Sequence, residues 1–427
     1  MKGSTAACRL KEYINTLKIY DTHEHLIPPQ IRSKKKEDIF SVLFSGYAGC
    51  DLISSGMSQR DFSVLVGEEA DLDTKWALLS PYLDFIKLTG YYRAVKRTLR
   101  CLFGADDINK ENYAELDAAR KNGYGVKNDR QLLQEKGNII LCIQDNLFKT
   151  CEYATDFVRP AFNINNLNPF TAVSRRDDLK EFEREAQKSL ESLSAFEQYF
   201  EEQVHLYQER GGIALKDAIA YERTLYFENT DYSCAEAAYQ KLYRGQSLPE
   251  PEIRRLQDYL THQAIKFAID CHLPIQIHTG MFGGNGKESR LLSNSNPVHL
   301  NNLFSKYPQA KFDIFHGAYP YCGELAALAK NFPNVHINLC WMQTISPHAA
   351  RYWLNEWLDT VPANKLFAFG GDCGYPEEVL GSCEVAKENV AAALAERMDA
   401  MELSEPEAQR IAEFLFYGNA AHFYGAV

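Results

Sequence analysis

The chain has 427 residues, of which 45% are hydrophobic and 24% charged, with a net charge of −11. These values are ordinary for a globular protein, and the excess of acid argues against general binding to nucleic acid or to an anionic membrane, which needs basic patches. The sequence has no run of 18 apolar residues and no signal-peptide pattern, so neither a membrane span nor export is expected. The eleven cysteines are scattered without a C-x-x-C pair, which indicates reduced thiols and a cytoplasmic protein.

In chain order, a short apolar run ends in the motif His23-Glu24-His25. Residues 26–136 follow, with apolar residues at three- and four-residue spacing, which predicts helices. From residue 137 onward, apolar runs of strand length alternate with helical patterns. The predicted strands lie near 18–22, 139–145, 157–164, 213–219, 274–278, 311–316, 335–340 and 366–371.

Strands that alternate with helices predict parallel βαβ units, and eight of them favour an α/β fold of the (β/α)8 TIM-barrel type. An open doubly wound sheet is the alternative, but neither G-x-G-x-x-G nor a P-loop motif supports it. We therefore expect a barrel from residues 1–25 and 137–427, with residues 26–136 as a helical insertion after strand 1 that covers the mouth of the active site.

Ionisable residues follow the predicted strands, at the end where TIM-barrel enzymes place their active sites. A single histidine after a strand is more often structural, and Asp372 alone could be a helix N-cap. Together, however, these residues fall at strand ends of one predicted barrel, which predicts a shared metal site. They are His23, His25, Lys216, His278, His316 and Asp372.

The order H-x-H, Lys, His, His, Asp along the strands resembles the amidohydrolase superfamily, in the amidohydrolase-related (amidohydrolase 2) branch. The long helical segment after "HEHLIPP" is similar to the insertion of uronate isomerases. The resemblance implies a divalent metal, most often zinc in such an imidazole-rich site, bound by His23, His25, His278 and Asp372. One metal is favoured over two, and a carboxylated Lys216 would serve as the bridge for a second.

The same resemblance implies that Asp372 is the general base, and that His316 and Lys216 take part in catalysis next to it. Metal-activated water would then attack an amide, ester or lactone of a small substrate. The residues themselves suggest substrate contacts near the strand ends, including arginines suited to a carboxylate. These candidate contacts are Tyr221, Arg223, Arg290, Tyr319 and Trp341.

Two other functions stay open. The same metal site could serve a uronate-isomerase-like isomerase or a non-oxidative decarboxylase, although the stretch "GGDCGYPEE" lacks the arginine that uronate isomerases have after the strand-eight aspartate. The third hypothesis is a non-catalytic barrel with a vestigial site. The expected partner is a small molecule, with no nucleic acid and no membrane; a homo-oligomer stays open.

Overall fold

A computed structural model of the protein describes residues 5–123, 128–145, 155–165, 169–284 and 290–425. Its eight strands form one sheet in sequence order, and each strand is parallel to the next. The strands are β1 Ile19–Glu24, β2 Ile139–Asp145, β3 Val158–Asn163, β4 Ala214–Asp217, β5 Ile275–Ile277, β6 Phe312–Ile314, β7 Val335–Asn338 and β8 Leu366–Phe367. All eight predicted strands are confirmed.

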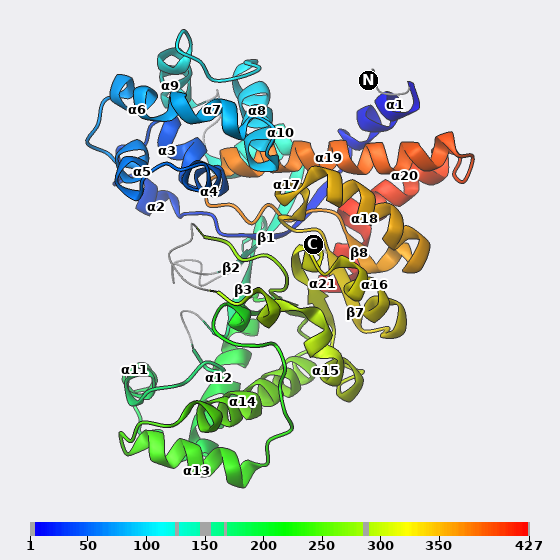
Figure 1. Ribbon diagram of the computed structural model, residues 1–427. Coiled ribbons are helices and arrows are strands. Elements are labelled where there is room, and N and C mark those ends of the chain that lie inside the picture. The colour runs from blue at the N-terminus through cyan, green and yellow to red at the C-terminus, as the bar shows by residue number, and fades with distance from the viewer. Residues whose placement is uncertain (1–4, 124–127, 146–154, 166–168, 285–289, 426–427) are drawn as a thin grey trace.

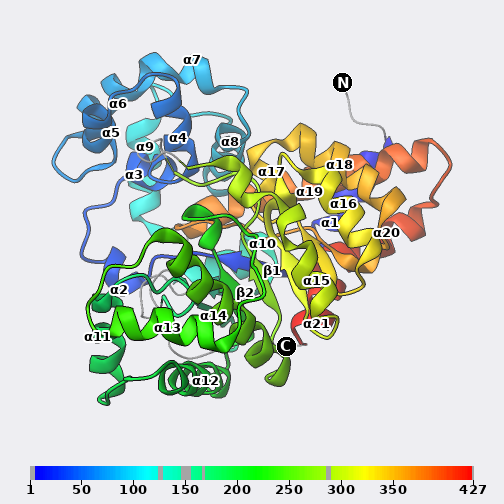
Figure 2. The ribbon, with the colours of Figure 1, turned by 60° about the horizontal axis from the view of Figure 1, so that its bottom comes forward.

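The sheet closes into a barrel where the first strand meets the segment after the last. The Thr22 N–H donates to the Phe369 carbonyl at 3.2 Å, and the Asp372 N–H donates to the His23 carbonyl at 2.9 Å. The chain therefore forms the predicted TIM barrel, with helices around it (Figures 1 and 2).

A helical region lies between β1 and β2 and forms the upper left part of Figure 1. Side chains cap several of its helices; Asp38, for example, accepts from the Phe40 and Ser41 N–H groups. The helices are α2 Pro29–Arg32, α3 Ile39–Phe44, α4 Tyr47–Ser54, α5 Gln59–Val66, α6 Leu72–Leu79, α7 Leu83–Ile86, α8 Gly90–Phe103, α9 Tyr113–Lys121 and α10 Asp129–Gly137.

Most of the other helices surround the barrel. They are α1 Thr5–Ile14, α11 Arg176–Ala186, α12 Leu193–Glu209, α13 Tyr232–Tyr243, α14 Glu250–Asp270, α15 Asn301–Lys306, α16 Cys322–Asn331, α17 Met342–Ile345, α18 Pro347–Thr360, α19 Pro376–Asp399, α20 Glu405–Glu413 and α21 Asn419–Tyr424. Short helical turns are η1 Ser80–Tyr82, η3 Ile219–Tyr221, η4 Leu292–Ser295, η5 Pro297–Leu300, η6 Phe315–Ala318, η7 Ala363–Lys365 and η8 Phe414–Gly418.

The helical region is fixed to the barrel by the packing of α8 on α19. Thr98 donates to the Glu377 carbonyl at 2.8 Å, and Arg97 forms an ion pair with Glu388 at 2.7 Å. A glycine at position 381 permits this close approach, because a Cβ there would lie 2.3 Å from the Ala94 carbonyl oxygen.

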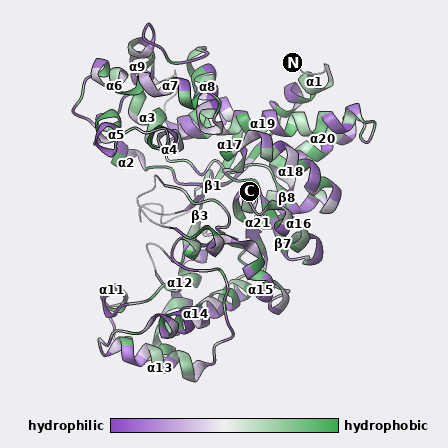
Figure 3. Ribbon diagram, in the orientation of Figure 1, coloured by the Kyte–Doolittle hydropathy of each residue, from purple (hydrophilic) through white to green (hydrophobic). Residues whose placement is uncertain are grey.

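Apolar residues concentrate between the strands and the surrounding helices, and polar residues dominate the outer helix faces (Figure 3). A separate apolar cluster fills the barrel near the start of its strands, where Phe423 and Tyr424 of α21 pack with Tyr20, Leu141 and Phe367. Among the described residues, no helix combines the length and apolar character that crossing a membrane requires.

Candidate active site

The two histidines of the β1 motif meet beside an aspartate that follows β8. His23 Nε2 and His25 Nε2 are 3.3 Å apart, and Asp372 Oδ1 lies 3.0 Å from His25 Nε2 and 3.5 Å from His23 Nε2. Burial alone would raise the pKa of Asp372, but the hydrogen bond from His25 and the surrounding imidazoles hold that pKa well below its ordinary value. Asp372 is therefore an ionised carboxylate in contact with two imidazoles.

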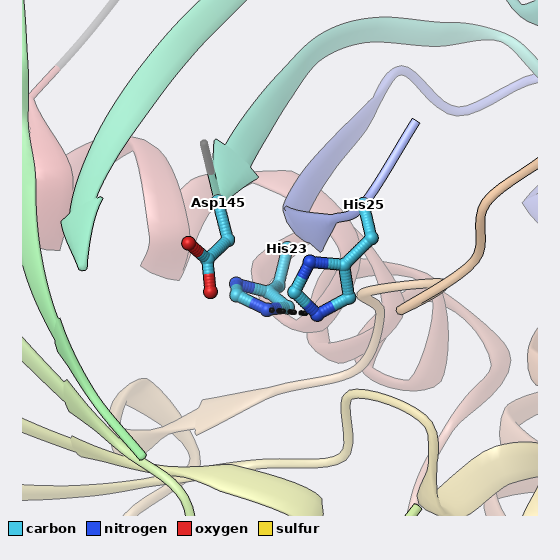
Figure 4. A group of neighbouring side chains, drawn as sticks. All are labelled: His23, His25 and Asp145. Carbon is cyan, nitrogen blue, oxygen red and sulfur yellow. Dashed lines mark hydrogen bonds between the residues drawn. The ribbon is translucent and has the colours of Figure 1, made fainter. Parts of the chain in front are cut away.

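A second carboxylate, Asp145 at the end of β2, completes a group of possible metal ligands with His23 and His25 (Figure 4). One ligand atom from each of the three lies within 4.8 Å of the other two. The Asn163 amide donates to both Asp145 oxygens, at 3.0 and 3.2 Å, and orients that carboxylate. His25 Nδ1 is buried and has no hydrogen-bond partner among the described residues. Two imidazoles and one or two carboxylates match the ligand set that zinc takes in catalytic sites.

The backbone around Asp372 is held by the residue between the two histidines. Glu24 accepts from the Gly371 N–H at 2.9 Å and from the Cys373 N–H at 2.8 Å, on either side of Asp372. A Cβ at Gly371 would lie 2.1 Å from a Glu24 oxygen, so this close contact requires glycine. Asp372 itself has φ +57°, an unusual backbone conformation for a non-glycine residue that its surroundings must impose.

His278 and His316 form a pair next to this group. His316 Nδ1 lies 3.0 Å from the Cys340 carbonyl oxygen, to which it donates, and His316 Nε2 lies 3.0 Å from His278 Nδ1. His278 Nε2 lies 3.0 Å from the Met281 carbonyl, so both of its nitrogens have neighbours outside the group of His23, His25 and Asp145. That His278 binds the metal therefore stays a prediction.

Lys216 of β4 is buried close to the same group. Its Nζ lies 3.9 Å from the centroid of the Phe315 ring, and the side chain is almost fully enclosed. Burial lowers the pKa of Lys216, while the nearby carboxylates of Asp145 and Asp372 oppose that shift. The catalytic role of Lys216 and its carboxylation stay predictions.

Tyr47 of the helical region and Trp341, which follows β7, form one wall of the site. The Tyr47 hydroxyl of α4 donates to Asp372 Oδ2 at 2.5 Å, and the Tyr47 ring stacks on Trp341 with centroids 4.5 Å apart. Trp341 also meets His316 edge to face at 5.0 Å, so this residue does lie at the site. An adjoining cavity of about 320 Å³ is lined by residues that include His25, Tyr47, Cys50, Asp372, Cys373 and Glu378.

Tyr221 and Arg290 lie together at the other side of His278. The Tyr221 ring centroid is 4.5 Å from that of His278, and the Arg290 guanidinium lies over the Tyr221 ring at 4.5 Å. Residues 285–289, which directly precede Arg290, lie outside the described residues. Tyr319 follows η6, and its side chain packs against the main apolar core.

Arg223, predicted as a substrate contact, lies against α14. Its guanidinium forms an ion pair with Asp258 at 2.5 Å and donates to the Tyr226 carbonyl at 3.0 Å. Both charged side chains are buried, at 8% and 1% exposure. This arrangement is typical of a structural ion pair, because a buried charge needs a partner in contact.

We expect Asp258→Ala to lower the free energy of unfolding by about 3 kcal/mol, because it leaves the Arg223 charge buried without its partner. Denaturant unfolding measures this change. The control is Lys180→Ala, which breaks the exposed ion pair of Lys180 with Asp177 and is expected to have little effect on stability. Unchanged stability together with an increased KM would instead make Arg223 a substrate-binding residue.

Residues 239–426 match the family profile described as Amidohydrolase. This match makes up a little under half of the chain, so the C-terminal part of the barrel resembles the amidohydrolase family. Two curated relatives match parts of it: Protein fluG of Emericella nidulans is 30% identical over 165 residues, which cover 36% of this chain and 19% of the relative. Uronate isomerase of Shouchella clausii is 23% identical over 312 residues, which cover 70% of this chain and 64% of the relative. The chain thus spans about a fifth of the length of Protein fluG and just under two thirds of the length of the uronate isomerase.

Solved structures of uronate isomerases share the fold of this chain. Uronate isomerase from Thermotoga maritima superposes with a TM-score of 0.81 at 16% identity, covering 98% of this chain and 97% of that one. Glucuronate isomerase from Caulobacter crescentus gives a TM-score of 0.79 at 16% identity, covering 98% and 94%. At this level of identity the likeness establishes the fold, a TIM barrel with helices between its first two strands.

Two residues of the candidate site were not predicted from the sequence. Asp145 is the last residue of the apolar run "IILCIQD", so the rule that selected the other strand ends would have selected it too. Tyr47 could not be found in this way. The spacing of apolar residues predicts a helix, but it does not predict which side chain of that helix will contact a distant strand.

Proposed function

We propose that this protein is a metal-dependent enzyme of the amidohydrolase family that acts on a small hydroxy-carboxylate, with isomerisation of a uronic acid as the main reaction. The observation that carries the proposal is the contact of Tyr47 with Asp372, which joins the helical region to the candidate metal site. Matches to uronate isomerases extend over most of the chain, including this region, and they support the same choice.

In this proposal His23, His25 and a carboxylate of Asp145 or Asp372 hold one divalent metal, zinc being favoured by the two imidazoles. When bound, the metal would polarise a substrate carbonyl or hydroxyl and lower the pKa of water. His278 and Lys216 are further proposed contacts at the site, and a second metal would require a carboxylated Lys216. Residues 1–25 and 137–427 form the barrel domain in this scheme, and residues 26–136 cover the mouth of its pocket.

Isomerisation moves a proton between adjacent carbons, so it needs a base and an acid close together. Asp372 and Tyr47 are hydrogen-bonded to each other, and the proton between them belongs to the Tyr47 hydroxyl, which donates to the Asp372 carboxylate. Neighbouring imidazoles keep the pKa of Asp372 low, whereas burial and the adjacent carboxylate raise the pKa of Tyr47 well above its ordinary value. We propose that Asp372 takes the proton from one carbon and returns it to the adjacent carbon. Tyr47 gives its proton to one substrate oxygen and regains a proton from the other, with His316 as a neighbouring contact.

Arg290 is the proposed partner of the substrate carboxylate. Its guanidinium is held over the Tyr221 ring, close to His278, and a guanidinium binds carboxylates in a fixed two-point geometry. This position compensates for the missing arginine after Asp372, where the chain has Cys373 instead. Trp341 would form the apolar wall opposite.

We expect the zinc- or manganese-loaded protein to convert D-glucuronate or D-galacturonate to the corresponding ketose, detected by proton NMR of the product mixture. Tyr47→Phe keeps the ring stack on Trp341 and removes only the hydroxyl, so it should lower kcat by about 10²-fold or more. Unchanged sugars after prolonged incubation with fully loaded protein would contradict the isomerase proposal.

Hydrolysis of an amide, ester or lactone is the second candidate. The observation in its favour is that ionised Asp372 touches both histidines of the motif, a position from which it could accept a proton from water. Turnover of a lactone panel without uronate conversion would favour it, and release of carbon dioxide would favour decarboxylation. Absence of both metal binding and turnover of these substrates would support the hypothesis of a non-catalytic barrel with a vestigial site.

A further inference from the structure

A buried polar chain runs from α21 through the barrel interior to His23. It consists of Asp313 on β6, Tyr424 on α21, Gln276 on β5 and His23 on β1. Gln276, Asp313 and His23 have no exposed surface, and Tyr424 is 7% exposed. Polar groups enclosed this completely must satisfy one another, so each hydrogen bond constrains the direction of the next.

The orientation of the Gln276 amide is fixed by a neighbour that can only accept. Its Nε2 lies 3.0 Å from the Thr22 carbonyl oxygen and 3.0 Å from the Tyr424 hydroxyl. If the amide were turned over, its own oxygen would face the Thr22 oxygen, and both atoms would lack a proton. The amide nitrogen therefore faces Thr22, and Gln276 Oε1 faces His23.

This orientation determines which nitrogen of His23 carries the proton. Gln276 Oε1 lies 3.2 Å from His23 Nδ1, and an amide oxygen can only accept. His23 Nδ1 must therefore be the donor. In a neutral imidazole this leaves Nε2 with a free lone pair, and His23 Nε2 is the atom that faces His25 and Asp372.

The far end of the chain supports the same direction. Tyr424 accepts from Gln276, so its own proton is free to go to Asp313 Oδ2, with which it is hydrogen-bonded. The Asn338 amide donates to the same Asp313 oxygen at 2.9 Å and to the Thr22 hydroxyl oxygen at 3.0 Å. Every donor in the network thus has an acceptor when the Gln276 amide nitrogen faces Thr22.

We propose that Gln276 is a positioning residue that holds His23 as the Nδ1–H tautomer, ready to ligate a metal through Nε2, and that α21 supports it through Tyr424. The inference rests on the metal site of the proposed function, but not on which reaction that site catalyses. A histidine fixed in this way loses no metal affinity to the competing tautomer.

The first test is the tautomer of His23 in the metal-free protein, read from the ¹H–¹⁵N long-range NMR pattern of its ring and assigned by comparison with His23→Gln. We expect the Nδ1–H pattern in the wild type. A ring protonated on Nε2 would overturn the proposal, and this outcome does not depend on whether any variant folds.

The second test is zinc affinity, measured by competition with a chromogenic chelator. We expect Gln276→Leu to weaken zinc binding by about 10- to 100-fold. The matched control is Gln343→Leu, which removes another buried glutamine, one that donates to the Ala368 carbonyl at 3.0 Å, and should leave zinc affinity unchanged. Equal affinity in Gln276→Leu and the wild type would overturn the proposal. Failure to isomerise uronates would contradict the proposed function, but it would not affect the results on the His23 tautomer and on zinc affinity.

Discussion

Replacing Asp372 by asparagine is expected to lower kcat/KM by about 10³-fold. The carboxylate contacts His25, His23 and the Tyr47 hydroxyl, and its depressed pKa keeps it ionised at neutral pH. Asparagine has nearly the same shape but carries no charge and accepts no proton. Both the isomerase and the hydrolase proposals assign the base to this residue, so both predict the loss.

The measurement is steady-state turnover of whichever substrate the uronate and lactone panels identify, with the metal content of each preparation determined in parallel. Asp258→Asn is the control, since it alters a different buried aspartate, which lies on α14 and pairs with Arg223. Comparable activity in Asp372→Asn and the wild type would exclude Asp372 as the base and shift attention to Asp145.

The double variant His23→Ala/His25→Ala should lose bound metal altogether. The two Nε2 atoms lie 3.3 Å apart, and each contributes one of the few nitrogen ligands the site offers. Elemental analysis of purified protein should give one metal per chain in the wild type and almost none in the variant. His205→Ala/His348→Ala removes two exposed histidines and should retain the metal.

The metal count distinguishes the remaining arrangements. Two metals per chain would place Lys216 among the ligands in carboxylated form. Loss of metal in Asp145→Asn, with retention in Asp372→Asn, would assign Asp145 as the carboxylate ligand and leave Asp372 to act as the base. A wild-type protein that takes up neither zinc nor manganese would rule out the metal-dependent reactions proposed above.

The barrel could be predicted from the sequence because its strands are buried on both faces and therefore read as continuous apolar runs. "IILCI" and "LFAF" are such runs, and the structure places a strand in each. Parallel topology alone predicts that polar residues at the strand ends converge, and His23, His25 and Asp372 do lie together in the structure.

The remaining parts of the site depend on contacts between distant segments. The position of Arg223 after a strand predicts a pocket residue, and the sequence does not reveal its ion-pair partner Asp258, which lies 35 positions later on α14. Tyr47 reaches Asp372 across 325 positions. Positive φ angles at His316, Trp341 and Asp372 are likewise imposed by surrounding packing, since none of these residues favours that conformation by itself.

The closure of the barrel between its first strand and the segment after its last has a consequence for how the protein matures. Glu24 bonds to the backbone beside Asp372 across 347 positions, so the site joins the two ends of the barrel sequence. During synthesis, the histidine pair and Asp145 emerge early, whereas Asp372 leaves the ribosome only after almost the whole barrel has been made. A metal bound through Asp372 would therefore report completed closure, whereas an ion captured by the unfinished chain would be held without that carboxylate.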